Sequence, residues 1–211
     1  MLEKPDSLIF DMDGTLWDAV DSYVMSWNEG VKLENIERIF TRADLDHVMG
    51  WERGKVLPYM FPDETTEEQE QIYETINQCR AKIIPKHGGV LYEGVRDGII
   101  NLASKYKLFI VSNCPKGLIV EFMKWANLQD YFVDEMAHGI NSMPKSHNIR
   151  LLMEKHNLQS PVYIGDTNGD SRDSRVANIP FALVTYGFGT SDDFDLKFDD
   201  FTSLTNYFLD L

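Results

Sequence analysis

The stretch Ser7-Leu8-Ile9-Phe10-Asp11-Met12-Asp13-Gly14-Thr15 joins a short apolar segment to a turn of aspartate, glycine and threonine. The apolar segment shows no helical periodicity, which is typical of a strand buried on both faces of a parallel sheet. Four later segments have the same character, at residues 108–112, 181–185, 162–165 and, more weakly, 131–133. The sequence therefore predicts five short buried strands.

Amphipathic stretches of helical length lie between the later strands. They cover residues 95–105, 117–127, 146–156 and 170–177. Alternation of strand and helix is typical of an α/β fold in which helices cover a parallel sheet. We expect a Rossmann-like, doubly wound parallel sheet.

One interval breaks this alternation, because residues 17–89 contain only helical patterning, notably at 20–31 and 67–84. Thr65 or Thr66, followed three residues later by Glu68 or Gln69, predicts a capping-box helix start. Pro85 and the Gly88-Gly89 pair indicate turns at the far end. We expect a catalytic core of residues 1–16 and 90–211 with a helical domain of residues 17–89 inserted after the first strand. The acidic run at 192–200 is predicted to be a solvated loop.

Charge and composition exclude several kinds of partner. The chain has 211 residues, with 20 Lys and Arg against 34 Asp and Glu, and its formal net charge is −14. Such a chain repels nucleic-acid backbones and anionic lipid, so we expect no nucleic-acid or membrane partner. A small anionic substrate then requires a bound cation or a local cluster of Lys and Arg.

The two cysteines, Cys79 and Cys114, form no CxxC pattern, and the N-terminal residues carry no apolar secretory segment. No apolar run has the length that crosses a bilayer. We therefore expect a cytoplasmic protein without a transmembrane helix, and a monomer is the default expectation.

Polar residues follow the predicted strands where an open α/β sheet binds its ligands. They are Asp11 and Asp13 after the first strand, Ser112 and Asn113 after the second, Lys145 before a helix, and Asp166 and Asp170 after the fourth. Converging carboxylates repel one another unless a cation compensates them. Mg²⁺ prefers carboxylate oxygens and leaves coordination positions for a phosphate oxygen. The pattern predicts a Mg²⁺ and phosphate site.

These motifs occur in an order that resembles the haloacid dehalogenase superfamily, and the resemblance extends from Leu8 to about Gly189. Phosphatases of this superfamily carry Asp-x-Asp-Gly-Thr, a Ser or Thr after the second strand, a separated Lys and a late Gly-Asp-x-x-x-Asp. The position of the insertion is similar to the helical cap of the phosphoglycolate-phosphatase and β-phosphoglucomutase branch. The resemblance implies a Mg²⁺-dependent phosphatase acting on a small soluble phosphomonoester.

The resemblance also implies roles for individual residues. Asp11 would be the nucleophile that forms an aspartyl-phosphate, and Asp13 would be the general acid and base, with its carbonyl on the metal. Backbone N–H groups at Gly14 and Thr15, together with Ser112, Asn113 and Lys145, would hold the phosphoryl group. Asp166 would bind the metal. Asp170 would either bind it through water or orient Lys145.

Two features bear on specificity. Trp17 stands where many relatives have an aliphatic residue, and its bulk is expected to narrow the substrate pocket. Arg53 and Lys55 are cations in a short Gly-bounded segment of the insertion and are candidates for substrate recognition. A solvated helix start is the alternative interpretation of these two cations.

Phosphoglycolate-like compounds, sugar phosphates and nucleotides all remain open as substrates. A sugar phosphomutase of the β-phosphoglucomutase type is the enzymatic alternative. A noncatalytic relative that binds a phosphate ligand is the alternative from another class.

Overall fold

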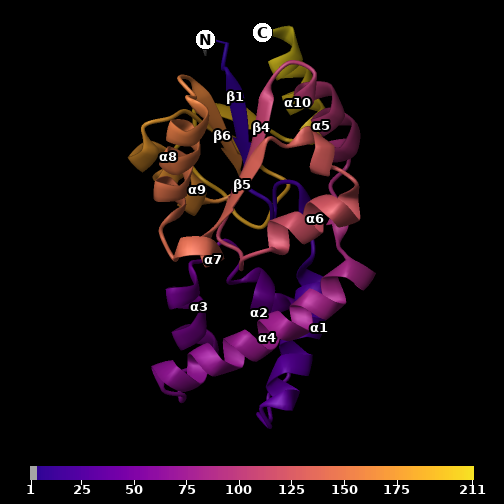
Figure 1. The fold of residues 1–211 in the computed structure, drawn as a ribbon, viewed down its shortest axis with the longest axis vertical. Helices are drawn as coiled ribbons and strands as arrows, with labels where there is room; N and C mark the ends of the chain where they lie inside the picture. Colours follow the sequence, from indigo (N-terminus) through magenta and orange to yellow (C-terminus); the bar gives the residue numbers. More distant parts are fainter. Residues whose placement is uncertain (1–3) are drawn as a thin grey trace. The chain divides into compact units, whose positions relative to one another are not determined.

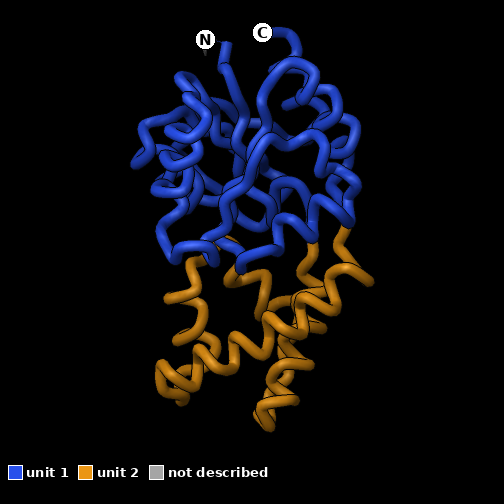
Figure 2. The backbone as a smooth tube through the Cα atoms, viewed as in Figure 1, with its two compact units in different colours: residues 1–18, 91–211 blue, residues 19–90 orange. Residues whose placement is uncertain are grey.

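The computed structural model describes residues 4–211, so residues 1–3 of the expected core lie outside the described part. The chain divides into two compact units (Figure 2). Unit 1 comprises residues 1–18 and 91–211, and unit 2 comprises residues 19–90.

Unit 1 is built on a six-stranded sheet with the order β5-β4-β1-β6-β7-β8. The strands are β1 (Ser7–Phe10), β4 (Lys107–Ser112), β5 (Asp134–Ala137), β6 (Pro161–Gly165), β7 (Phe181–Val184) and β8 (Leu196–Phe198). All neighbouring strands pair in parallel. Their carboxyl ends therefore meet at one edge of the sheet.

Helices cover both faces of this sheet (Figure 1). They are α5 (Val95–Ala103), α6 (Leu118–Ala126), the short α7 (His138–Asn141), α8 (Lys145–His156), α9 (Asn168–Ala177) and α10 (Phe201–Asp210). The predicted α/β class with a doubly wound parallel sheet is confirmed.

Alternation along the strands explains why both faces are covered. Ile9 and Phe109 belong to a buried cluster with Ile149 of α8 and Ala177 of α9. Phe10, the next residue of β1, points to the other face, where its ring lies 6.0 Å from that of Phe201 at the start of α10. Because successive side chains of a strand point to opposite faces, a strand buried on both sides must be apolar throughout.

Two elements at the edges of the sheet differ from the prediction. Residues 129–131 form a 3-10 turn rather than leading into a strand at 131–133, and the strand follows at Asp134–Ala137. Its sequence, Asp-Glu-Met-Ala, is polar because an edge strand is not enclosed by apolar neighbours. Likewise, the segment expected as a solvated loop contains β8 at Leu196–Phe198.

Unit 2 consists of α1 (Val20–Leu33), α2 (Arg42–Asp46), α3 (Arg53–Met60) and α4 (Thr66–His87). Helices α1 and α4 pack closely, since a Cβ at Gly30 would overlap Ile76. Trp27 of α1 stacks its ring on that of Phe61, which follows α3, with 5.8 Å between the ring centres. The remaining sheet has two short strands, β2 (Trp17–Asp18) and β3 (Val90–Leu91).

The boundaries of α4 bear on two expectations. Thr65 and Glu68 form the predicted capping box, with the Glu68 N–H donating to Thr65 Oγ1. At the other end of α4, the expectation of a turn at Pro85 is wrong, because the helix continues through Pro85 to His87. The Gly88 N–H donates to the Ile84 carbonyl, and the positive φ of Gly88 then ends the helix. None of the helices in residues 4–211 combines the length and apolar character of a membrane span.

Candidate active site at the carboxyl edge of the sheet

Asp11 follows directly on β1 and is held at the centre of the sheet. Its N–H donates to the Ile164 carbonyl of β6 at 2.8 Å, and only 2% of its surface is exposed. The turn that follows requires glycine at position 14, where φ is +82° and an added Cβ would overlap the Asp166 carboxylate. The first strand end is thereby brought against the residue that follows β6.

Three carboxylates converge at this edge. Asp11, Asp166 and Asp170 each offer an oxygen, and these oxygens all lie within 4.8 Å of one another. All three residues are buried. Lys145, the first residue of α8, is also buried and lies 3.1 Å from Asp11 Oδ2 and 2.5 Å from Asp170 Oδ1. One ammonium group therefore joins two of the three carboxylates.

Both oxygens of Asp170 are occupied by protein partners. Oδ1 accepts from Lys145, and Oδ2 accepts from the N–H and the hydroxyl of Thr167 at 3.0 and 2.6 Å. Thr167 and Asp170 thus form the capping box that begins α9. Of the two roles expected for Asp170, this geometry supports the orientation of Lys145.

Asp166 is held differently, because only one of its oxygens has a partner in the part of the chain that the structure describes. Oδ2 accepts from the N–H of Phe188 at 2.7 Å and of Gly189 at 3.3 Å. Oδ1 is buried and has no hydrogen-bond partner among the described residues, and the same is true of Asp11 Oδ1. A buried carboxylate oxygen without a partner is costly. Two such oxygens in one cluster fit the ligand set of a divalent cation.

The electrostatics of the cluster agree with this fit. Burial, together with the charges of Asp170 and Asp13, outweighs the attraction of the Lys145 ammonium and raises the pKa of Asp11 to about 7. Burial, followed by the charges of Asp170 and Asp11, raises the pKa of Asp166 well above its ordinary value. Although burial lowers the pKa of Lys145, the Asp11 and Asp170 carboxylates raise it overall. The surplus of negative charge is the kind that a bound cation compensates.

Asp13 lies beside this cluster and is partly buried. Its Oδ1 accepts a hydrogen bond of 3.0 Å from the indole N–H of Trp17. Trp17 itself is fully buried, with its ring 4.8 Å from that of Phe122 and 5.6 Å from that of Trp125. The expectation that Trp17 narrows a substrate pocket is therefore corrected, because the structure places its side chain in the core and against Asp13.

The expected phosphate-binding residues lie at two strand ends. Gly14 and Thr15 belong to the turn after β1, and the Thr15 carbonyl accepts from the Tyr186 hydroxyl at 2.9 Å. The Thr15 hydroxyl oxygen is buried without a partner among the described residues. Ser112 is the buried last residue of β4, and Asn113 follows it.

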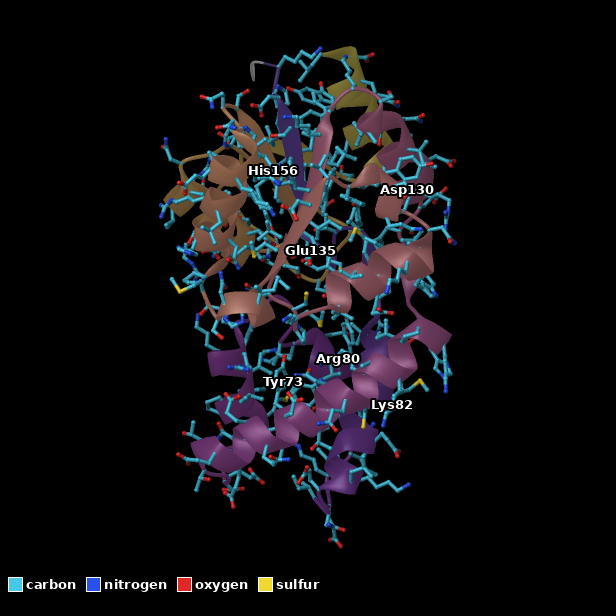
Figure 3. All side chains as sticks on the ribbon, viewed as in Figure 1. Tyr73, Arg80, Lys82, Asp130, Glu135 and His156 are labelled. Carbon is cyan, nitrogen blue, oxygen red and sulfur yellow. The ribbon has the colours of Figure 1, made fainter. Side chains whose placement is uncertain are left out.

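Arg53 and Lys55 lie on α3 of unit 2. Arg53 begins the helix, pairs with Glu70 at 3.4 Å and lies 5.7 Å from the centre of the Tyr73 ring. Arg80 lies 5.8 Å from the same ring, and Figure 3 labels both Tyr73 and Arg80. Lys55 is exposed. Within unit 2, Arg53 therefore has both an ionic and an aromatic partner.

The sequence analysis missed several residues that hold the cluster. Thr167 fixes Asp170, and the N–H groups of Phe188 and Gly189 fix Asp166. The Tyr163 ring lies 5.5 Å from Lys145 Nζ, and its hydroxyl donates to the Val111 carbonyl. The pattern Gly187-Phe188-Gly189 after the last long strand was a usable signal, since glycines mark close backbone approach.

The buried carboxylates and the lysine lie at the carboxyl edge of a parallel sheet, where open α/β folds bind their ligands. The haloacid dehalogenase-like hydrolase family model matches residues 8–184. The chain belongs to this family, which confirms the resemblance drawn from the order of its motifs.

Curated relatives and solved structures agree with this assignment. The chain is 25% identical over 206 residues to a phosphoglycolate phosphatase of Colwellia psychrerythraea, covering 91% of this chain and 89% of that protein. It is also 25% identical over 219 residues to the phosphoglycolate phosphatase of Escherichia coli K12, covering 90% and 85%. A haloacid dehalogenase-like hydrolase structure from Streptococcus pneumoniae has a TM-score of 0.83 at 19% identity, covering 97% and 99%. The prediction of a phosphatase is confirmed.

Proposed function

We propose that this phosphatase is Mg²⁺-dependent and hydrolyses a small phosphomonoester through an aspartyl-phosphate on Asp11. The observation that carries the proposal is the pair of buried oxygens on Asp11 and Asp166 that have no hydrogen-bond partner within residues 4–211 and lie beside the ammonium of Lys145. Asp11 and Asp166 would hold the cation, together with the backbone carbonyl of Asp13. Bound Mg²⁺ would neutralise the carboxylates and the charge of the phosphoryl group.

The first chemical step forms a bond between the Asp11 carboxylate and phosphorus while the bond to the leaving oxygen breaks. Lys145 holds Asp11 through its contact with Oδ2 and reduces the repulsion between this carboxylate and the phosphate. Asp170 and Thr167 keep Lys145 in place. Asp13 gives its proton to the departing alcohol oxygen.

The second step removes the phosphoryl group from Asp11. A water molecule loses a proton to the Asp13 carboxylate and attacks phosphorus, and the bond to Asp11 breaks. Asp13 is then protonated and Asp11 is ionised, so the residues return to their starting states. The turn at Gly14 and Thr15, with Ser112 and Asn113, would hold the phosphoryl oxygens in both steps.

The names of the curated relatives favour one class of phosphomonoester as the substrate. The curated relatives are phosphoglycolate phosphatases, so a small phosphate ester whose alcohol carries a carboxylate is the first candidate. Arg53 and Lys55 of the inserted unit are the candidate cations for recognition of that carboxylate. Sugar phosphates and nucleotides are the comparison substrates.

The experiment is phosphate release from phosphoglycolate, hexose phosphates and nucleoside monophosphates, with Mg²⁺ and with EDTA. We expect Mg²⁺-dependent release that falls at least about 10³-fold in Asp11→Asn, because the nucleophile is lost. The matched control is Asp130→Asn, an exposed aspartate of unit 1, which should retain wild-type rates. Wild-type turnover by Asp11→Asn contradicts the proposed nucleophile. Interconversion of sugar phosphates without net phosphate release would instead indicate a mutase.

A further inference from the structure

Hydrogen bonds between Trp17 and residues 12–14 close the turn that carries Asp13. Besides the bond between Trp17 Nε1 and Asp13 Oδ1, the Gly14 N–H donates to the Trp17 carbonyl at 3.0 Å. The Trp17 N–H in turn donates to the Met12 carbonyl at 3.3 Å. The side chain and the backbone of Trp17 therefore both engage the segment that carries the proposed acid and base.

The indole of Trp17 is itself immobilised by packing. It is fully buried, and the rings of Phe122 and Trp125 on α6 lie against it at 4.8 and 5.6 Å. A large aromatic side chain enclosed in a close-packed core has one accessible orientation. The direction of its N–H is thus set by the core of unit 1, whereas Asp13 is only partly buried.

We propose that Trp17 is a positioning residue for Asp13, which it aims at the leaving oxygen by holding Oδ1. This inference rests on the proposed function. An indole N–H is only a donor, so it bonds the unprotonated oxygen and directs the proton of Asp13 to Oδ2. Trp17 therefore selects both the orientation of the carboxyl group and the oxygen that carries the proton.

The proton balance of the first step shows when this positioning matters. As the phosphorus–oxygen bond of the ester breaks, the proton on Asp13 Oδ2 moves to the alcohol oxygen, and Asp13 remains ionised with Oδ1 on the indole N–H. An aliphatic alcohol is a poor leaving group and needs this proton. A p-nitrophenolate ion leaves without one, because its negative charge is already stabilised.

The test compares kcat/KM of wild type and Trp17→Phe on phosphoglycolate and on p-nitrophenyl phosphate. The parameter kcat/KM reports the steps up to transfer of the phosphoryl group to Asp11. We expect a loss of about 10- to 100-fold on phosphoglycolate, the size of effect that misplacement of a catalytic group produces. On p-nitrophenyl phosphate the loss should stay below about 3-fold. Phenylalanine retains most of the ring packing and removes the N–H donor.

Two further variants separate positioning from general damage to the core. Trp27→Phe removes a buried indole from the core of unit 2, which has no part in the proposed positioning of Asp13, and should leave the ratio of the two kcat/KM values unchanged. In an Asp13→Asn background, Trp17→Phe should cause no further change in that ratio, since residues that act through one another are non-additive. Thermal melting checks that each variant is folded.

The outcomes are distinguishable. Equal losses on the two substrates in Trp17→Phe, or an equally changed ratio in Trp27→Phe, overturn the positioning role and leave the phosphatase proposal standing. A wild-type protein that releases phosphate from neither substrate with Mg²⁺ contradicts the proposed function itself. If Trp17→Phe does not fold, Asp13→Asn with wild-type Trp17 still tests the premise, because it must lose phosphoglycolate turnover selectively.

Discussion

Asp166 and Asp170 lie four residues apart and carry the same side chain, yet their partners give them different tasks. Asp170 has both oxygens occupied, by Lys145 and by Thr167. Asp166 has one oxygen held by backbone N–H groups and one buried without a partner among the described residues. Sequence spacing treats the two residues alike, and only their contacts distinguish the proposed cation ligand, Asp166, from Asp170, which is proposed to orient Lys145.

Substitution of each aspartate by asparagine tests this division. Asp166→Asn should raise the Mg²⁺ concentration for half-maximal activity at least about 10-fold, because it removes a carboxylate ligand. Asp170→Asn should mainly lower kcat, since Lys145 loses an ionic partner, and should change the Mg²⁺ requirement less. Titration of activity with Mg²⁺ measures both quantities. A larger change in Mg²⁺ requirement in Asp170→Asn than in Asp166→Asn would reverse the assignment.

At the scale of elements, the edge strand β5 is tied to the end of α8. Asp134 Oδ2 lies 2.7 Å from His156 Nε2 and 2.7 Å from Lys155 Nζ, and His156 is labelled in Figure 3. Burial raises the pKa of Asp134, but hydrogen bonds from His156 and Lys155 outweigh it and lower the pKa below its ordinary value. The basic residues in the last turn of α8 also complement the helix dipole.

This lowered pKa predicts the pH dependence of one contribution to stability. An aspartate whose pKa is lower in the folded state stabilises the protein above its unfolded pKa of 3.8, and the contribution disappears as the pH falls through the folded value. Asp134→Asn should therefore lower the free energy of unfolding by about 1 kcal/mol or less at pH 7. The difference from wild type should shrink below about pH 4.

Urea unfolding at pH 7, 5, 4 and 3 measures the effect on Asp134→Asn and wild type. Asp130→Asn, an exposed aspartate of the nearby 3-10 turn, serves as the control and should match wild type throughout. If Asp134→Asn destabilises the protein equally at all four pH values, the ionised Asp134 carboxylate does not contribute to stability, and the prediction is wrong.

At the scale of the whole molecule, the proposed cation site exists only in the folded chain. Asp11 and Asp166 are far apart in sequence and meet because β1 and β6 are neighbours in the sheet. A ligand that binds only the folded state stabilises it by mass action, by about 2.7 kcal/mol at 100 times its dissociation constant. For a chain of this size, such a change corresponds to roughly 5–10 °C in Tm.

Thermal melting with increasing Mg²⁺ checks this expectation. The Tm of wild type should rise with the Mg²⁺ concentration and return to its starting value on addition of EDTA. Asp166→Asn should need a higher Mg²⁺ concentration for the same rise. A Tm that does not respond to Mg²⁺ in wild type contradicts a cation site of useful affinity.

Sequence patterns predicted the central strands well and the edges poorly, for a physical reason. Strands β1 and β4 are enclosed on both faces, so their central residues, 8–10 and 108–111, are all apolar, and such runs are recognisable. Strand β5, Asp-Glu-Met-Ala, lies at an edge and is held mainly by backbone pairing with β4. Backbone pairing leaves little trace in residue type, so this strand was predicted three residues too early.

Residue patterns along the chain were enough to predict the fold class, the family and the carboxylates and lysine of the site, because an apolar strand followed by a polar turn can be recognised locally. The contacts of the folded chain show which oxygens of Asp11 and Asp166 have no partner among the described residues, and that Trp17 is fully buried against Asp13. Those facts depend on contacts between residues of separate strand ends and helices. Such contacts are set by the packing of the whole unit and not by any segment alone.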